Sequence, residues 1–190
     1  MMRLFLGVFL SLLTIESSFS QVNPFSVLGR VVTTTMDMRT KAEVTADTEI
    51  AAGASKRLLD DKKAEWAGVS VLVFAQHVVL AGAVKSADVK KRVEEVVRLD
   101  KSIRSLKNEL RVGDVGSLAR DTVLEAEINA KLTAAKGVSS VNMRWSATGG
   151  RVVLMGIAQS KEEAALAQSL VKGIKGVRSL QSHLRVVPKK

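Results

Sequence analysis

The chain of 190 residues contains no cysteine, no tyrosine, two prolines and 4% aromatic residues. Without cysteine it has no disulfide, no thiol nucleophile, no thiolate metal site and no lipid-modified N-terminal cysteine. The scarcity of aromatic side chains argues against a surface on which nucleic-acid bases stack. The charge is one-sided, with 29 lysines and arginines against 19 aspartates and glutamates and a net charge of +10. Such a charge attracts nucleic acid, anionic lipid surfaces or acidic proteins, and composition does not choose among them.

Long hydrophobic runs are also missing, apart from a short one near the N-terminus. This run, residues 4–15, spans 12 residues, against about 20 for a helix that crosses a bilayer. Arg3 precedes it, and the small residues of Ser18-Phe19-Ser20 follow it. We therefore predict a secretory signal peptide over residues 1–20, cleaved after Ser20, with an uncleaved anchor as the alternative. An exported protein meets membrane leaflets and envelope polymers and rarely meets chromosomal DNA, so we expect no nucleic-acid partner.

The second half of the chain repeats the first. "HVVLAG" at residues 77–82 returns as "RVVLMG" at residues 151–156, 74 positions later, and the match extends to the chain end without a gap. Backward, Asp47 matches Asp121 at the same offset. Before the first Val-Val pair, the alignment is expected to need a two-residue insertion in the second copy. This pattern predicts two tandem copies of one small domain.

Each copy is expected to open with a helix and a β-hairpin. Apolar residues recur at helical spacing at Ile50, Ala54 and Leu58 and at Leu124, Ile128 and Leu132. Asp47 and Asp121 are expected to be the N-caps of these helices. Period-two alternation then predicts strands through Val69, Val71 and Val73 and through Val141, Met143 and Trp145. Gly149 and Gly150 are expected to form one hairpin turn, and residues 75–77 a shorter one.

The rest of each copy is expected to be a strand, a second helix and a last strand. Gly82 and Gly156 fall inside the β-branched strand, where glycine is useful if another backbone approaches closely. Ser86 and Ser160 are the expected N-caps of the second helix, and "SKEE" from Ser160 reads as a capping box. The predicted fold is α+β: two tandem αββαβ units, each a three-stranded mixed sheet covered by two helices.

The predicted organisation has four parts. They are a signal peptide at 1–20, an N-terminal arm at 21–42, a first domain at 43–113 and a second domain at 114–187. The second part of the chain is the more cationic, since residues 114–190 carry a net charge of +6 and residues 21–113 a net charge of +4.

Several of these motifs resemble the BON domain. The resemblance rests on the Asp-Thr pair near the start of each copy, the "VVLxG" strand, the capped helix and the closing "GVRSLQSHLRV". The segment "FSVLGRVVTTTMDMRTKAEV", residues 25–44, also looks like the lead-in of double-BON envelope proteins. The resemblance implies a non-enzymatic protein of the bacterial periplasm or outer membrane that binds phospholipid and supports envelope integrity.

The resemblance also implies which part binds lipid. In double-BON members the first helix of the second domain is the suspected lipid-facing element. An aromatic often found near the start of that helix is replaced here by Val123, and copy one has Lys101-Ser102-Ile103 where the family usually has a glycine-valine turn. The candidate lipid-binding residues on this helix and the following hairpin are Arg120, Val123, Lys131, Lys136, Arg144 and Arg151.

No constellation in the sequence indicates catalysis. His77 and His183 have no acid or second histidine at metal-ligand spacing, and no nucleophile elbow or phosphate loop is present. We expect no catalytic residue, no metal and no cofactor. The preferred hypothesis is an exported protein that binds anionic phospholipid surfaces. The alternatives are a periplasmic protein–protein adaptor without direct lipid binding and, less favoured, an enzyme; the oligomeric state stays open.

Overall fold

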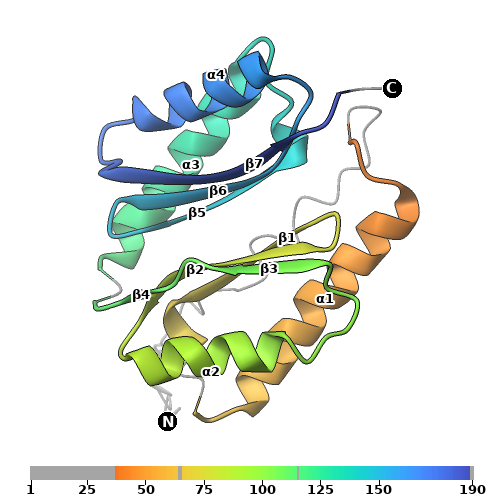
Figure 1. Ribbon diagram of the computed structural model, residues 1–190. Coiled ribbons are helices and arrows are strands. Elements are labelled where there is room, and N and C mark those ends of the chain that lie inside the picture. Colours follow the sequence, from red (N-terminus) through yellow and green to blue (C-terminus); the bar gives the residue numbers. More distant parts are fainter. Residues whose placement is uncertain (1–36, 64–65, 115, 189–190) are drawn as a thin grey trace, which may run out of the picture.

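The structure, a computed structural model, describes residues 37–63, 66–114 and 116–188. The predicted signal peptide and residues 21–36 of the predicted arm lie outside the described residues. The described chain forms two αββαβ units, each with two helices on one face of its sheet (Figure 1). This confirms the predicted α+β fold.

The elements of the first unit follow the expected order. They are α1 (Lys41–Asp60), the short 3₁₀ helix η2 (Trp66–Gly68), β1 (Val69–Phe74), β2 (His77–Val84), α2 (Ala87–Val97), β3 (Ser105–Asn108) and β4 (Arg111–Val112). Those of the second unit are α3 (Leu118–Ala134), the 3₁₀ helix η3 (Ser140–Asn142), β5 (Met143–Thr148), β6 (Arg151–Ala158), α4 (Lys161–Lys172) and β7 (Ser179–Val186).

The two sheets share one topology. β1 pairs antiparallel with β2, and β2 pairs in parallel with β3 and β4; β5, β6 and β7 repeat this arrangement. The last strand of the first unit is interrupted between Asn108 and Arg111, so the first sheet has four strands and the second has three. α2 and α4 make the crossover between the parallel strands, as a parallel connection requires.

The 74-residue offset holds throughout the hairpin, and the expected two-residue insertion is wrong. Val69 lies opposite Gly82, and Met143, 74 positions later, lies opposite Gly156. The second-copy strand therefore starts at Met143, and Val141 belongs to η3. The apolar alternation in the sequence extends back to Val141, two residues before the strand begins. Aligning Val141 with Val69 is what made a two-residue insertion seem necessary.

The two hairpin turns also have the same length. Ala75 and Gln76 turn with φ of 51° and 63°, and Gly149 and Gly150 with φ of 58° and 78°. Both are two-residue turns, in which φ is positive at each central position. His77 is the first residue of β2 and pairs with Phe74, so the prediction of a shorter turn in the first copy is wrong.

The caps of the second helices are confirmed in part. Ser86 accepts a hydrogen bond from the amide of Val89 at 3.2 Å, and Ser160 accepts one from the amide of Glu163 at 3.1 Å. The predicted reciprocal bond of the capping box is not formed. The Glu163 carboxylate instead accepts from the amides of Ser139 and Gln159, each at 2.7 Å.

The inner faces of the two sheets pack against each other and form a third core between the units. Leu72 and Phe74 from β1 meet Val153 and Met155 from β6, and all four are at most 3% exposed. Each sheet therefore has helices on one face and the other sheet on the second face (Figure 1). Strands buried on both faces need nearly continuous apolar runs, as β2 and β6 have.

Polar contacts surround this core. The Ser146 hydroxyl donates to the Ser70 hydroxyl at 3.0 Å. Glu109, in the break between β3 and β4, binds the Arg151 guanidinium at 2.7 Å and the His183 ring at 3.0 Å. The interruption of the first unit's last strand thus places a carboxylate between the two units.

A three-residue segment before α1, residues 37–39, also joins the units; we call it the strap. Arg39 is buried, binds Asp37 at 2.6 Å and Asp47 at 3.0 Å, and lies over the Phe74 ring at 4.5 Å. Met38 packs against the core between the units, and its amide donates to the Asn142 side chain at 2.8 Å. The strap therefore contacts the first unit through Arg39 and the second through Met38.

Candidate functional site

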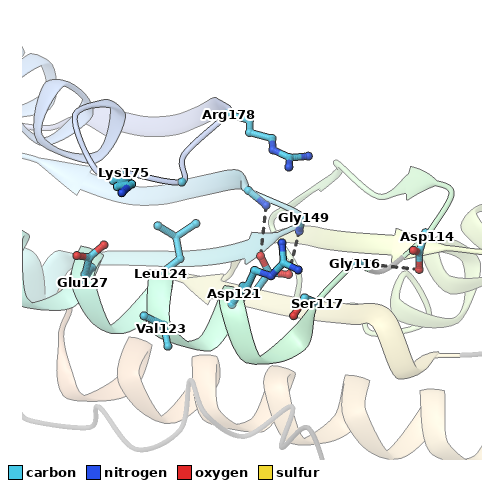
Figure 2. A pocket seen from close by; sticks show the side chains of 13 residues that line it. Asp114, Gly116, Ser117, Asp121, Val123, Leu124, Glu127, Gly149, Lys175 and Arg178 are labelled. Atoms are coloured by element: carbon cyan, nitrogen blue, oxygen red, sulfur yellow. Dashed lines mark hydrogen bonds between the residues drawn. The ribbon is translucent and has the colours of Figure 1, made fainter.

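A hollow of about 500 Å³ opens on the second unit (Figure 2). Its walls are the linker before α3, the first turns of α3, the β5–β6 turn and the loop between α4 and β7. The lining residues that matter below are Asp114, Arg120, Asp121, Val123, Glu127, Lys175 and Arg178.

The Asp121 side chain binds the β5–β6 turn that forms one wall of this hollow. Its buried carboxylate accepts hydrogen bonds from the amides of Gly149 at 2.9 Å and Gly150 at 3.3 Å. Asp47 does the same in the first unit, accepting from the amides of Ala75 at 2.7 Å and Gln76 at 2.6 Å. Each aspartate fastens its helix to the hairpin turn, whose amides would otherwise be buried without a partner.

The prediction that Asp47 and Asp121 are N-caps is therefore wrong. The helices begin earlier: Thr40, the N-cap of α1, is about two turns before Asp47, and Ser117, the N-cap of α3, is about one turn before Asp121. Thr40 forms a capping box with Glu43, whereas the Ser117 side chain makes no capping hydrogen bond.

Three cations stand at the rim of the hollow. Arg120 comes from α3. Lys175 and Arg178 come from the loop between α4 and β7 (Figure 2). All three are exposed, and none makes an ion pair with any residue that the structure describes. Of the lining carboxylates, Asp121 is held by the turn amides and Asp114 accepts from the Gly116 amide at 3.2 Å, while Glu127 is exposed.

α3 presents an exposed stripe beside the hollow. Arg120, Val123, Glu127 and Lys131 recur at intervals of three and four residues, the spacing of one helix face. Val123 is 65% exposed, and Leu118 at the start of the helix is 49% exposed. A valine this exposed gains nothing for the fold, so it is free for contact with another apolar surface.

The structure brings some of the six candidate residues together and separates others. Arg120 and Val123 line the hollow, and Lys131 follows on the same stripe about 16 Å along the helix axis at 1.5 Å per residue. Lys136 is exposed in the loop beyond α3. Arg120, Val123 and Lys131 therefore share one exposed face of α3.

Arg144 and Arg151 lie elsewhere, between the two units. Arg144 is 6% exposed, donates to the carbonyls of Val141 and Met143, and lies 5.2 Å from the centre of the Phe74 ring. Arg151 donates to the backbone carbonyl of Glu109 at 2.8 Å as well as to its carboxylate. These two candidates therefore do not share a face with Arg120.

Lys175 and Arg178 were not among the expected site residues. They are about 55 residues from Arg120 along the chain and reach the hollow because the β-sheet places the α4–β7 loop beside the hairpin turn. The amide of Arg178 donates to the Gly150 carbonyl at 2.7 Å. The signal in the sequence was the absence of carboxylates around these residues, since no aspartate or glutamate follows Glu163.

The corresponding end of the first unit is closed by an ion pair. At the 74-residue offset, Glu43 stands where Ser117 is and Arg104 where Arg178 is. Arg104 binds Glu43 at 3.3 Å, and the Gln76 side chain donates to the Ser102 carbonyl at 3.2 Å. Hydrogen bonds from Thr40 and the charge of Arg104 outweigh burial and hold the pKa of Glu43 below its ordinary value.

Two further differences point the same way. Arg120 stands where the first unit has Ala46, and Val123 where it has Glu49. Relative to the first unit, the second has therefore lost two carboxylates and gained a cation and an exposed apolar side chain along this face.

No group of three or more histidine, aspartate or glutamate side chains in residues 37–63, 66–114 and 116–188 is placed to hold a metal ion. Among the helices of that same part of the chain, none combines the length and the hydrophobicity that a membrane span requires.

Known proteins resemble this chain over most of its length. It is 31% identical to osmotically-inducible protein Y of Escherichia coli (strain K12) over 147 residues, which covers 73% of this chain and 72% of that protein. It is 32% identical over 125 residues to an uncharacterised protein from the gshII 5′ region of Anaplasma centrale, covering 64% of this chain and 83% of that one.

Solved structures are more distant. The match to CdsD, a structural protein of the Type III secretion system of Chlamydia trachomatis, has 17% identity and a TM-score of 0.33, and covers 74% of this chain and 64% of that one. The family model of the BON domain matches this chain twice, at residues 46–114 and at residues 120–188. The chain therefore belongs to the BON-domain family and carries two copies of the domain.

Proposed function

We propose that this protein is a non-catalytic component of the bacterial envelope that binds anionic phospholipid surfaces through the second BON domain. Export with removal of residues 1–20 and a peripheral position in the periplasm are part of the same proposal. The observation that best supports the proposal is a contrast between the domains. In the second domain the exposed Val123 lies among three unpaired cations, whereas in the first domain Arg104 forms an ion pair with Glu43.

The magnitudes favour a charge-driven, reversible contact. A lysine or arginine near an anionic leaflet contributes about 1 kcal/mol, so Arg120, Lys175 and Arg178 together contribute about 3 kcal/mol. Burial of Val123 adds about 1.5 kcal/mol at most. Because charge supplies the larger part, we expect salt to weaken the binding as the Debye length falls from about 10 Å at 0.1 M to about 3 Å at 1 M.

Vesicle cosedimentation of the mature chain tests this proposal. Vesicles that contain phosphatidylglycerol should retain the protein at low salt, and vesicles of phosphatidylcholine alone should not. The triple variant Arg120→Glu, Lys175→Glu, Arg178→Glu should lose about tenfold or more in affinity.

A matched control separates the site from the overall charge. The variant Lys62→Glu, Lys101→Glu, Lys107→Glu changes three exposed lysines of the first domain and removes the same net charge. Its affinity should fall much less. An equal loss in both triple variants, or binding to neutral vesicles that salt leaves unchanged, would contradict the proposal.

A further inference from the structure

β7 is an open sheet edge. It pairs with β6 along all eight of its residues, and it is the last strand in the order β5-β6-β7, so no strand in the described part of the chain pairs with its outer side (Figure 1). None of its side chains is fully buried, whereas β5 at the opposite edge buries nearly all of its own. An unprotected edge is a ready template for another strand.

The equivalent edge of the first domain is protected. The strand breaks at Asn108, whose amide group donates to the Lys90 carbonyl at 3.2 Å and to the Glu94 carboxylate at 2.9 Å. Such interruptions keep edges from pairing with other chains. Leu106 and Leu110 are 8% and 2% exposed there, while their counterparts in β7 are only partly buried.

The backbone of β7 has donors and acceptors that point outward. The amides of Ser179 and Val187, at its two ends, donate to the carbonyls of Gly150, just before β6, and of Ala158, the last residue of β6. Since successive residues of a strand alternate in direction, the odd-numbered residues bond to β6 and the even-numbered ones face outward. The Leu184 amide donates to the Ser182 hydroxyl at 3.4 Å. The outward amides of Leu180, Ser182 and Val186 therefore remain to pair with another strand.

The surroundings of this edge are cationic. After Glu163 the described part of the chain holds Lys172, Lys175, Arg178 and Arg185 and no carboxylate. Arg185 on β7 is half-buried and makes no ion pair within the described residues, and burial together with the charge of Arg104 lowers its pKa. The nearby acids are engaged, Glu109 by Arg151 and His183 and Glu43 by Arg104.

We propose that β7 accepts an extended acidic segment of another protein by strand addition. Main-chain hydrogen bonds to Leu180, Ser182 and Val186 supply the pairing, and acidic side chains neutralise Arg178 and Arg185. A second copy of this chain fits less well, because each copy carries a net charge of +10. This interaction shares Arg178 with the proposed lipid site, but it rests on the open edge of β7 and not on the exposed face of α3.

The test uses the mature chain and an acidic peptide of alternating glutamate and valine, about ten residues long to match a strand. Amide hydrogen exchange followed by NMR reports pairing at single residues. With the peptide bound, the amides of Leu180, Ser182 and Val186 should exchange more slowly. Binding without slower exchange in β7 would show a purely electrostatic contact and overturn the proposal.

Ser182→Pro and Ser182→Ala form a matched pair of variants. Proline removes the outward N–H of residue 182 and no hydrogen bond to β6, as edge strands tolerate. Both variants lose the serine hydroxyl, so their difference isolates the strand edge. The proline variant should bind the peptide about tenfold more weakly, and the alanine variant about as well as the parent chain.

A second pair of variants covers the case in which the proline disturbs the fold. Arg185→Glu should also weaken peptide binding about tenfold, and Lys101→Glu, on the exposed surface of the first domain, should not. Two other results overturn the proposal: slower exchange of the β7 amides with rising protein concentration alone, which would identify a second copy, and the same protection by phosphatidylglycerol vesicles, which would identify a membrane.

Discussion

Gly82 and Gly156 occupy the same place in the two domains, and the same contact explains both. Their φ angles are +119° and +135°, and a Cβ atom would lie 1.9 Å from the Gly68 carbonyl oxygen in one case and 2.1 Å from that of Asn142 in the other. The expected close approach of another backbone is confirmed. A side chain is excluded at both positions by space as well as by backbone angle.

Substitution of either glycine should be costly. Gly82→Ala and Gly156→Ala should each lower the free energy of unfolding by about 3 kcal/mol or more, from backbone strain plus the displaced strand. Gly113→Ala is the control, because Gly113 also has a positive φ, +146°, but has nothing within 4 Å of a Cβ. Urea unfolding measures all three. A cost at Gly113 as large as that at Gly82 would refute the close approach as the cause.

At the residue scale, contacts that span a few positions could be predicted and longer ones could not. Ser86 and Ser160 cap helices through amides three residues away, so their role is visible in the local sequence. Asp47 and Asp121 look the same locally, but their partners are 28 and 29 residues away. A carboxylate near a helix start has two possible uses, and only the packed hairpin selects between them.

At the scale of elements, the strap joins the two domains, and its Arg39 is held by the ionised carboxyl group of Asp37. Burial alone would raise the pKa of Asp37, but hydrogen bonds from Arg39 outweigh it and hold the pKa below the ordinary value of 3.8. Because the folded-state pKa is the lower one, ionised Asp37 stabilises the fold above the ordinary carboxyl range. This contribution is lost as the pH falls through the folded-state pKa.

Acid unfolding of Asp37→Asn should show this contribution. The parent chain should lose more stability than the variant between about pH 5 and pH 2, since the variant has no carboxyl group to protonate there. Asp60→Asn is the control, because Asp60 is exposed and pairs with Lys56 on the surface of α1. Unfolding free energies at several pH values measure the effect. Parallel pH profiles of the parent chain and Asp37→Asn would rule out this role for the strap.

The order of elements could be predicted because the repeat supplied each pattern twice. The break in the last strand of the first domain could not be predicted. Asn108 and Glu109 are polar residues in a region of strand-like alternation, and their partners come from α2 and from the second domain. Local periodicity carries no information on such partners.

At the scale of the whole molecule, two sheets packed face to face form one body with different outer sides. Arg144 and Arg151 were candidate lipid-binding residues, yet contacts with Phe74 and Glu109 place them between the domains. The unbroken apolar runs of β2 and β6 were the available signal, since they indicate burial on both faces. Lys175 and Arg178 reach the hollow only through the fold.

The central claim is that α3, and not its counterpart α1, meets the lipid surface. Since the chain has no cysteine, one introduced cysteine can carry a polarity-sensitive fluorophore at a single position. Val123→Cys and Glu49→Cys label equivalent exposed positions of the two helices. On vesicles that contain phosphatidylglycerol, the emission of the label at 123 should shift to the blue and return with salt, while that at 49 should not change. An equal or larger shift at 49, or no shift at either position while the protein sediments with the vesicles, would contradict the account.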